Sequence, residues 1–230
     1  MQLVKITARS NRSVPALRKT LVAFLLLLAS SCAHLPPLAP IDANTAKTAA
    51  ERCRQAFPAQ PWRATHAIFA SLPFGQNGGL IGVSAATAGQ LHAILLSPEG
   101  VSLFDGVQRN SSGSGLLVHR AVPPFDRPDF SASLMADLGN AFLSPAGEPV
   151  AIGTYRTGET VCRWSPPGGE TTDVELGTNA ARAIRTFRSL HITREILLVG
   201  LPASGFYPMV VLRTPGAGGY TLEMRLVDRE

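Results

Sequence analysis

From residue 62 to the end, short segments in which apolar and polar residues alternate are separated by turns rich in glycine and proline. Alternation with a period of two places the apolar side chains on one face of a β-strand. The clearest case is residues 220–227, where every second residue from Tyr220 to Leu226 is large and apolar. The close spacing of these segments predicts an antiparallel meander in a mainly β domain and argues against a helical bundle.

One segment breaks the strand pattern. Between about residues 129 and 143, apolar residues recur at the spacing of an amphipathic helix. Asp129 is the expected N-cap, and Pro145 lies just past the expected end. The sequence leaves two interpretations open: a core helix laid across the sheet, or a lid over an apolar cavity. The residues expected to line that cavity or lid are Phe130, Leu134, Met135, Leu138 and Phe142.

Two other segments have helical character. Residues 46–56 are rich in Ala, Arg, Glu and Gln, which predicts a short N-terminal helix that carries Cys53. Residues 178–190 fit a helix, a strand or an irregular crossover, and the strand or crossover is favoured. The predicted fold is therefore α+β but mainly β: a curved antiparallel sheet or incomplete β-barrel with a short N-terminal helix and a lid or core helix.

The first 31 residues have the pattern of a leader. Residues 1–20 carry five basic residues and no acid, and residues 21–29 are continuously apolar. This run is much shorter than the about 20 residues that cross a bilayer as a helix, but it fits a secretory signal peptide. The stretch from Leu28 to Cys32 resembles the bacterial lipobox, in which the cysteine thiol receives a diacylglyceryl group and the new N-terminus an acyl chain such as palmitate. Ser31 and Ala29 depart from the commonest lipobox residues, so an ordinary signal peptide with a chance cysteine is the alternative.

The leader sets the expected organisation of the chain and explains its charge. We expect a signal peptide over 1–31, a lipidated Cys32 with a proline-rich tether over 32–46, and a single domain over 47–230. The leader holds 5 of the 21 Lys and Arg residues, so the mature part has 16 basic and 16 acidic residues. No basic excess remains to neutralise phosphates, which argues against a nucleic-acid partner.

Three cysteines are present, and lipidation of Cys32 would leave Cys53 and Cys162 as a pair. In an oxidising compartment two such thiols can form a disulfide. Two separate buried thiols are the alternative, because the sequence does not show whether the two side chains meet.

No pattern of catalytic or metal-ligating residues is apparent. His66, His92, His119 and His191 lie in or beside predicted strands, without the spacing that places two ligands on one face. A G-x-S-x-G nucleophile motif and a phosphate-binding loop are absent. We therefore expect no enzyme activity, no cofactor and no metal.

The order of these elements resembles the LolA/LolB-like superfamily of periplasmic lipoprotein carriers, in particular its outer-membrane lipoprotein branch. The resemblance depends on Gly100–Gly106, the helix from Asp129 to Leu143, and Gly219–Met224 in the last strand. It implies an incomplete β-barrel around an apolar cavity, with helices as lids, that receives acyl chains of lipids or lipoproteins and passes them to the outer membrane. The exposed apolar loop that LolB-type proteins insert into membranes has two candidates here: Leu72-Pro73-Phe74 and Phe206-Tyr207.

Three hypotheses follow. The first is a lipoprotein anchored through Cys32 in the outer membrane, facing the periplasm, that carries or inserts acylated cargo; Ala33 favours this sorting, because no aspartate follows the cysteine as a retention signal. The second is a non-catalytic envelope scaffold or assembly accessory with a filled core and an exposed apolar patch. The third is an enzyme, which would need a polar cleft with a perturbed acid or histidine.

Overall fold

The computed structural model describes residues 35–72, 77–87, 89–109, 115–216 and 218–230. Residues 35–230 form one compact unit that contains every described helix and strand. The signal peptide predicted over residues 1–31, and Cys32, lie outside the described residues. None of the helices in the described ranges is long and apolar enough to cross a membrane.

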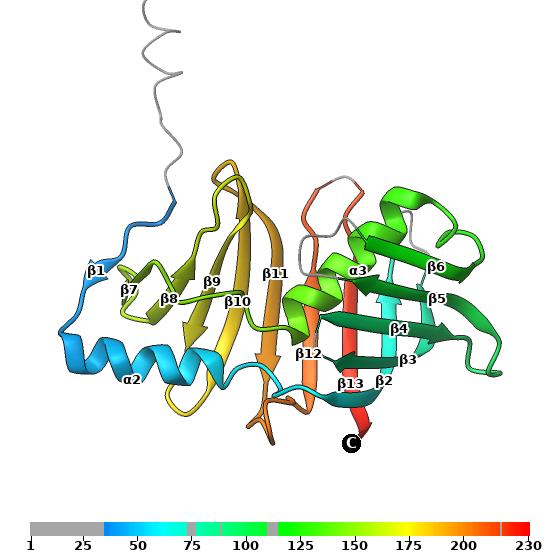
Figure 1. The fold of residues 1–230 in the computed structure, drawn as a ribbon, viewed down its shortest axis with the longest axis horizontal. Helices are drawn as coiled ribbons and strands as arrows, with labels where there is room; N and C mark the ends of the chain where they lie inside the picture. The colour runs from blue at the N-terminus through cyan, green and yellow to red at the C-terminus, as the bar shows by residue number, and fades with distance from the viewer. Residues whose placement is uncertain (1–34, 73–76, 88, 110–114, 217) are drawn as a thin grey trace, which may run out of the picture. The chain divides into compact units, whose positions relative to one another are not determined.

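A single antiparallel sheet of 13 strands makes up most of the unit (Figure 1). The order across the sheet is β1-β7-β8-β9-β10-β11-β12-β13-β2-β3-β4-β5-β6, so β1 and β6 are its two edges and the sheet is open. In Figure 1, β3 to β6 run across the direction of β9 to β13, which shows how strongly the sheet twists and bends. The predicted mainly β fold with a curved, unclosed sheet is confirmed. The strands are β1 Ala39–Pro40, β2 Trp62–Ser71, β3 Asn77–Thr87, β4 Gln90–Leu96, β5 Ser102–Arg109, β6 Gly115–Ala121, β7 Ala151–Thr154, β8 Thr160–Trp164, β9 Thr171–Leu176, β10 Ala181–Arg188, β11 His191–Val199, β12 Met209–Arg213 and β13 Thr221–Arg229.

Helix α3, Pro128–Phe142, lies across one face of the sheet and packs on β12, β4 and β5. The helix predicted at 129–143 is therefore confirmed. Its N-cap is Arg127, not Asp129 as predicted, and the Arg127 side chain makes no capping hydrogen bond. Pro128 begins the helix, because its fixed φ suits the first turn and its missing N–H needs no partner there. Asp129 lies within this turn, where a negative charge interacts favourably with the helix dipole.

Helix α2, Ala43–Arg54, covers the other end of the sheet, over β7, β8 and β9. It begins three residues earlier than predicted, because the Asp42 carboxylate accepts hydrogen bonds from the Asn44 and Thr45 backbone N–H groups at 3.1 and 3.0 Å. The tether predicted over 32–46 lies partly within the described residues. Its described part is bound to the domain: β1 pairs with β7, and the Arg163 guanidinium donates to the Pro36 carbonyl at 2.9 Å.

The pairing of Cys53 and Cys162, which the sequence left open, is settled by a buried disulfide. It joins α2 to β8, with Cα atoms 6.4 Å apart. Val174 on β9 packs in the same core cluster. The disulfide therefore holds the N-terminal helix against the sheet that it covers.

Strand β9 is buried along its whole length, including the residues on the face away from α2. On that face a row of register partners alternates in charge across five neighbouring strands. Oppositely charged residues that face each other across strands stabilise a sheet, and the buried carboxylates of β9 need such partners. The residues of the row are Arg163, Asp173, Arg185, Glu195 and Arg213.

This row explains why residues 178–190 contain a strand and not a helix. Arg185 on β10 pairs with Glu175 on β9 and with Glu195 on β11, the latter at 3.1 Å. Arg182 also reaches Glu175, at 2.6 Å, from the irregular start of β10. A helix would remove these cations from the buried carboxylates, so the tertiary contacts decide the local structure.

We predict that replacing both disulfide cysteines with serine lowers the free energy of unfolding by about 4–5 kcal/mol, because the bridge closes a loop between residues 109 apart. Urea denaturation of residues 33–230 with and without the Cys53→Ser and Cys162→Ser changes measures this. An unchanged midpoint would contradict the structural role of the bridge.

Candidate functional site beneath helix α3

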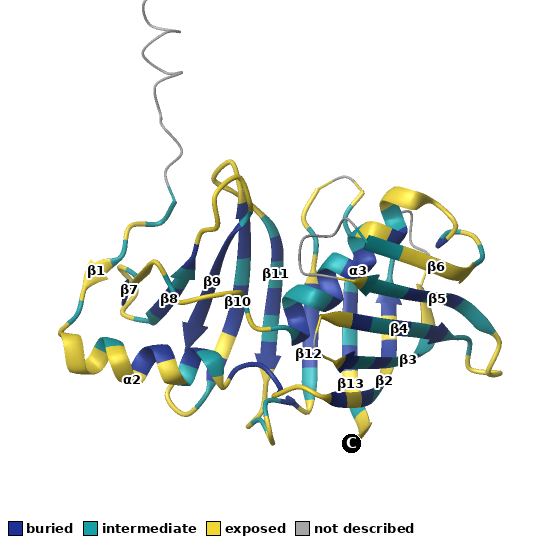
Figure 2. Ribbon diagram, viewed as in Figure 1, coloured by how far each residue is buried: buried dark blue, intermediate teal, exposed yellow. Residues whose placement is uncertain are grey.

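A closed apolar cavity of about 30 Å³ lies between α3 and the sheet. The helix contributes Phe130, Leu134 and Leu138, three of the residues expected from the sequence. Facing them are apolar side chains from β2, β4 and β13, among them Ile68, Leu95, Leu222 and Met224. The apolar face of α3 is thus buried against the sheet (Figure 2), and little free volume remains between them.

A second cavity of about 10 Å³ lies towards the C-terminal end of α3. Phe142 and Leu138 line it from the helix, and His66 and Ser84 line it from β2 and β3. Met135, the last of the expected residues, is fully buried in the core cluster and lines neither cavity. The two cavities share four lining residues: Ile68, Leu95, Leu138 and Met224. They are therefore neighbouring parts of one interface, apolar at one end and partly polar at the other.

His66 is the unusual residue of this interface. Its side chain is buried, its ring packs 5.2 Å from that of Phe142, and its Nε2 has no hydrogen-bond partner among the described residues. Burial disfavours the charged imidazolium and lowers the pKa of His66 to about 4. The ring is therefore neutral near pH 7.

An ion pair holds the middle of α3 to the sheet. The Arg194 guanidinium on β11 donates to the carboxylate of Asp137 on α3, and the Tyr220 hydroxyl donates to the same carboxylate. Asp137 is completely buried, and Arg194 is 8 % exposed. Arg194 also pairs with Glu170 at 2.8 Å. Burial raises the pKa of Asp137 to about 6, although the Arg194 charge opposes the shift.

The sequence analysis did not identify this pair, although one signal was present. Asp137 lies three residues after Leu134 and seven after Phe130, so helical spacing places it on the apolar face of α3. A carboxylate on a buried face needs a cation or several donors. The sequence does not reveal which of its arginines supplies that cation.

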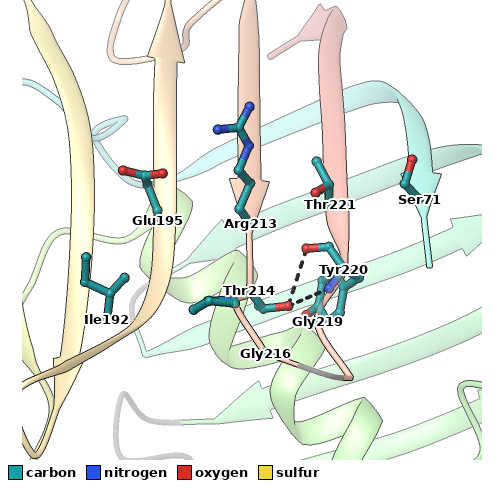
Figure 3. A pocket seen from close by; sticks show the side chains of 10 residues that line it. Ser71, Ile192, Glu195, Arg213, Thr214, Gly216, Gly219, Tyr220 and Thr221 are labelled. Atoms are coloured by element: carbon teal, nitrogen blue, oxygen red, sulfur yellow. Dashed lines mark hydrogen bonds between the residues drawn. The ribbon is translucent and has the colours of Figure 1, made fainter. Parts of the chain in front are cut away.

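A larger groove of about 570 Å³ lies on the face of the sheet away from α3. Figure 3 shows Glu195, Arg213 and Thr221 projecting into it from β11, β12 and β13, and these three residues are register partners. The groove is open, and polar and charged side chains line it together with a glycine-rich turn and a few apolar side chains. Despite its size we do not take it as the candidate site, because it lacks the enclosed apolar surface of a ligand pocket.

The remaining sequence predictions fall elsewhere. Phe206 and Tyr207, one of the two candidates for an exposed membrane-inserting loop, are 4 % and 2 % exposed and are therefore buried. In the other candidate, Leu72 lines the apolar cavity, and Pro73 and Phe74 lie outside the described residues. His92 pairs with Asp105 at 2.8 Å on neighbouring strands. The described residues contain no group of three or more side chains placed to hold a metal ion.

Removing the cation of the buried pair should destabilise the fold. We predict that Arg194→Met lowers the free energy of unfolding by about 3–5 kcal/mol, because the Asp137 carboxylate is left buried without its partner. Adding Asp137→Leu should restore much of the loss. Urea denaturation of the single and double variants measures both effects, and a double variant no more stable than Arg194→Met would contradict the coupling.

The buried neutral His66 should make the fold sensitive to acid. Its folded-state pKa lies below the ordinary value of 6.5, so its contribution to stability is present above pH 6.5 and is lost as the pH falls to about 4. As the pH falls from 6.5 to 4, we predict that the free energy of unfolding of the wild type drops by about 3 kcal/mol relative to that of His66→Leu. Asp137 is present in both proteins, so its contribution cancels in this comparison. Its raised pKa changes stability with pH in the direction opposite to that of His66. A stability difference that does not change with pH would contradict the prediction.

Comparisons with known proteins bear on the fold. No family model matches the chain, and no curated protein matches it. Among solved structures, a LolA superfamily protein from Nitrosomonas europaea superposes with a TM-score of 0.51 and 8 % identity, over 80 % of this chain and 92 % of that one. A domain named as an outer membrane lipoprotein-sorting protein domain, from Vibrio parahaemolyticus, has a TM-score of 0.48 and 9 % identity, over 82 % and 93 %. The fold is thus similar to that of the Nitrosomonas europaea LolA superfamily protein, which agrees with the resemblance seen in the sequence.

Proposed function

We propose that this protein is a non-catalytic, lipid-anchored envelope protein that binds acyl chains of lipids or lipoproteins between α3 and the sheet. The observation that supports this most is the interface beneath α3, where apolar side chains of a helix and a curved sheet face each other around residual free volume. The fold likeness to a LolA superfamily protein also supports it. In this proposal Phe130, Leu134 and Leu138 contact the bound chain.

The observed state is closed. Ligand pockets are roughly 300–1,000 Å³ in volume, and the cavity of about 30 Å³ is too small for an acyl chain. Binding therefore requires α3 to move away from the sheet. Such a movement must break the contacts of Asp137 with Arg194 and Tyr220, or Arg194 and Tyr220 must move together with α3. Entry of a ligand would replace the apolar contacts of α3 with contacts to the chain, so little apolar surface need be exposed to water.

Two features support a location in the cell envelope. The leader has the pattern of a lipoprotein signal peptide with Cys32 at the attachment position. The disulfide between Cys53 and Cys162 is a feature of proteins in oxidising compartments such as the periplasm. Anchoring to the outer membrane through Cys32 is part of the proposal, and it is favoured by Ala33, the residue after the cysteine.

The small volume of the cavity also favours a second candidate. A scaffold or assembly accessory would keep α3 permanently packed as a core helix and would bind partners on its surface. Exposed apolar side chains are present for this, among them Phe69 on β2, at 49 %, and Leu117 on the edge strand β6, at 47 %. The two candidates differ in whether α3 ever leaves the sheet.

The deciding experiment is native mass spectrometry of residues 33–230 exported to the periplasm, followed by organic extraction. We expect a stoichiometric acyl lipid to co-purify and to compete with a fluorescent acyl-ester probe. Leu134→Asp should abolish binding, because it places a charge on the buried face of α3, whereas Ala132→Asp on its exposed face should not.

Far-UV circular dichroism of both variants is the control. If Leu134→Asp keeps its secondary structure and loses the ligand, the carrier proposal is supported. A ligand-free wild type that does not bind the probe would contradict it in favour of the scaffold.

A further inference from the structure

Two buried ring nitrogens without hydrogen-bond partners lie at one end of the interface beneath α3. Trp62 Nε1 and His66 Nε2 have no partner among the described residues, and both rings pack on Phe142, with centroids 5.8 and 5.2 Å away. A buried polar group without a partner costs about 1–3 kcal/mol. Such groups are uncommon in folded proteins, and each calls for an explanation.

Of these two residues, His66 lines a cavity. Its side chain is 97 % buried, since 3 % remains exposed, and it borders the space of about 10 Å³ between Phe142, Leu138 and β3. Ser84, which is 6 % exposed, borders the same space from β3. This end of the interface therefore offers an imidazole and a hydroxyl group in otherwise apolar surroundings.

The rest of the interface has no comparable free polar group. The neighbouring cavity is lined by aliphatic and aromatic side chains, and the hydroxyl of its one polar residue, Tyr220, donates to Asp137. Four residues line both cavities, so the apolar space lies next to the one that His66 and Ser84 border. A molecule that occupied both would meet hydrogen-bonding groups at one end and only apolar groups along the rest.

We propose that His66 and Ser84 are the polar end of the acyl site and hydrogen-bond the carbonyl oxygen of a bound acyl ester or amide, with its chain directed towards Phe130. This inference rests on the proposed function and specifies the chemical class of its ligand. His66 and Ser84 would determine specificity by donating hydrogen bonds to an acceptor that a plain hydrocarbon lacks.

The charge state of the site selects a neutral carbonyl group. Burial keeps the His66 ring neutral, and among the described residues no cationic side chain lines either cavity. An ionised carboxylate buried there would have no counter-charge, which is strongly unfavourable. An ester or amide carbonyl needs only hydrogen-bond donors. The site therefore favours esterified or amide-linked acyl groups, as on lipids and acylated proteins, over free fatty acids.

The test compares two probes that differ only in the carbonyl group: 1-palmitoylglycerol and its ether analogue 1-O-hexadecylglycerol. Each displaces a fluorescent probe from residues 33–230, the compact unit that contains every described element. We expect the wild type to bind the ester about fivefold more tightly than the ether, since one buried hydrogen bond contributes on the order of 1 kcal/mol. Ionised palmitate should bind more weakly than the ester.

Variants of His66 test whether its ring causes the preference for the ester over the ether. His66→Leu, of similar size, should remove the preference, so that ester and ether bind with equal affinity. His66→Gln, which keeps an N–H donor, should retain part of the preference, and Ser84→Ala should reduce it. Ala132→Asp on the exposed face of α3 is the matched control and should bind both probes as the wild type does.

The outcomes separate this inference from the proposed function. If the wild type binds ester and ether equally, or if His66→Leu keeps the full preference, the inference is overturned and acyl binding stands. If the wild type binds neither probe, the proposed function itself fails. The ratio of the two wild-type affinities needs no variant, so the test remains decisive if His66→Leu does not fold.

Discussion

Helix α3 is held to the sheet by the buried ion pair between Asp137 and Arg194, and the state of the candidate site depends on this contact. Apolar packing along α3 would by itself allow the helix to slide or rotate, because such packing is not directional. The ion pair is directional, since the carboxylate must meet one guanidinium and the Tyr220 hydroxyl together. It fixes the register of the helix, and with it the two small cavities that α3 closes.

The two ends of the sheet are stabilised by different means. Over β12 and β2 to β5 the sheet is covered by α3, and all the described contacts between them are non-covalent. Over β7 to β9, α2 is attached by a disulfide, and the opposite face is covered by the charged row and by Pro36. The two helices are thus attached differently, α2 by a covalent bond and α3 by apolar packing and a buried ion pair. In the proposed function this asymmetry lets α3 move without loss of the fold.

On the face of the sheet away from α2 and α3, the strand order brings oppositely charged residues together, and these charges in turn favour that strand pairing. Arg163, Arg185 and Arg213 are far apart in the sequence, yet antiparallel pairing places them in one row with Asp173 and Glu195 between them. The strand that contains Arg185 was ambiguous from its own residues, because Arg and Ala fit either secondary structure. The buried carboxylates of β9 favour the strand, because only a strand places Arg182 and Arg185 beside them.

Local periodicity by itself determined the fold class, the position of α3 and the residues of its apolar face. The alternation from Tyr220 to Leu226 and the spacing from Phe130 to Phe142 reflect backbone geometry, which nearby residues are sufficient to specify. The docking of Pro36, the pairing of Asp137 with Arg194 and the burial of His66 were decided only by the tertiary structure. Asp137 and Arg194 are 57 residues apart, and no local pattern determines which side chains meet across a sheet. The sequence therefore determines the elements and their buried faces, whereas the polar contacts that give the candidate site its chemistry depend on how distant strands pair.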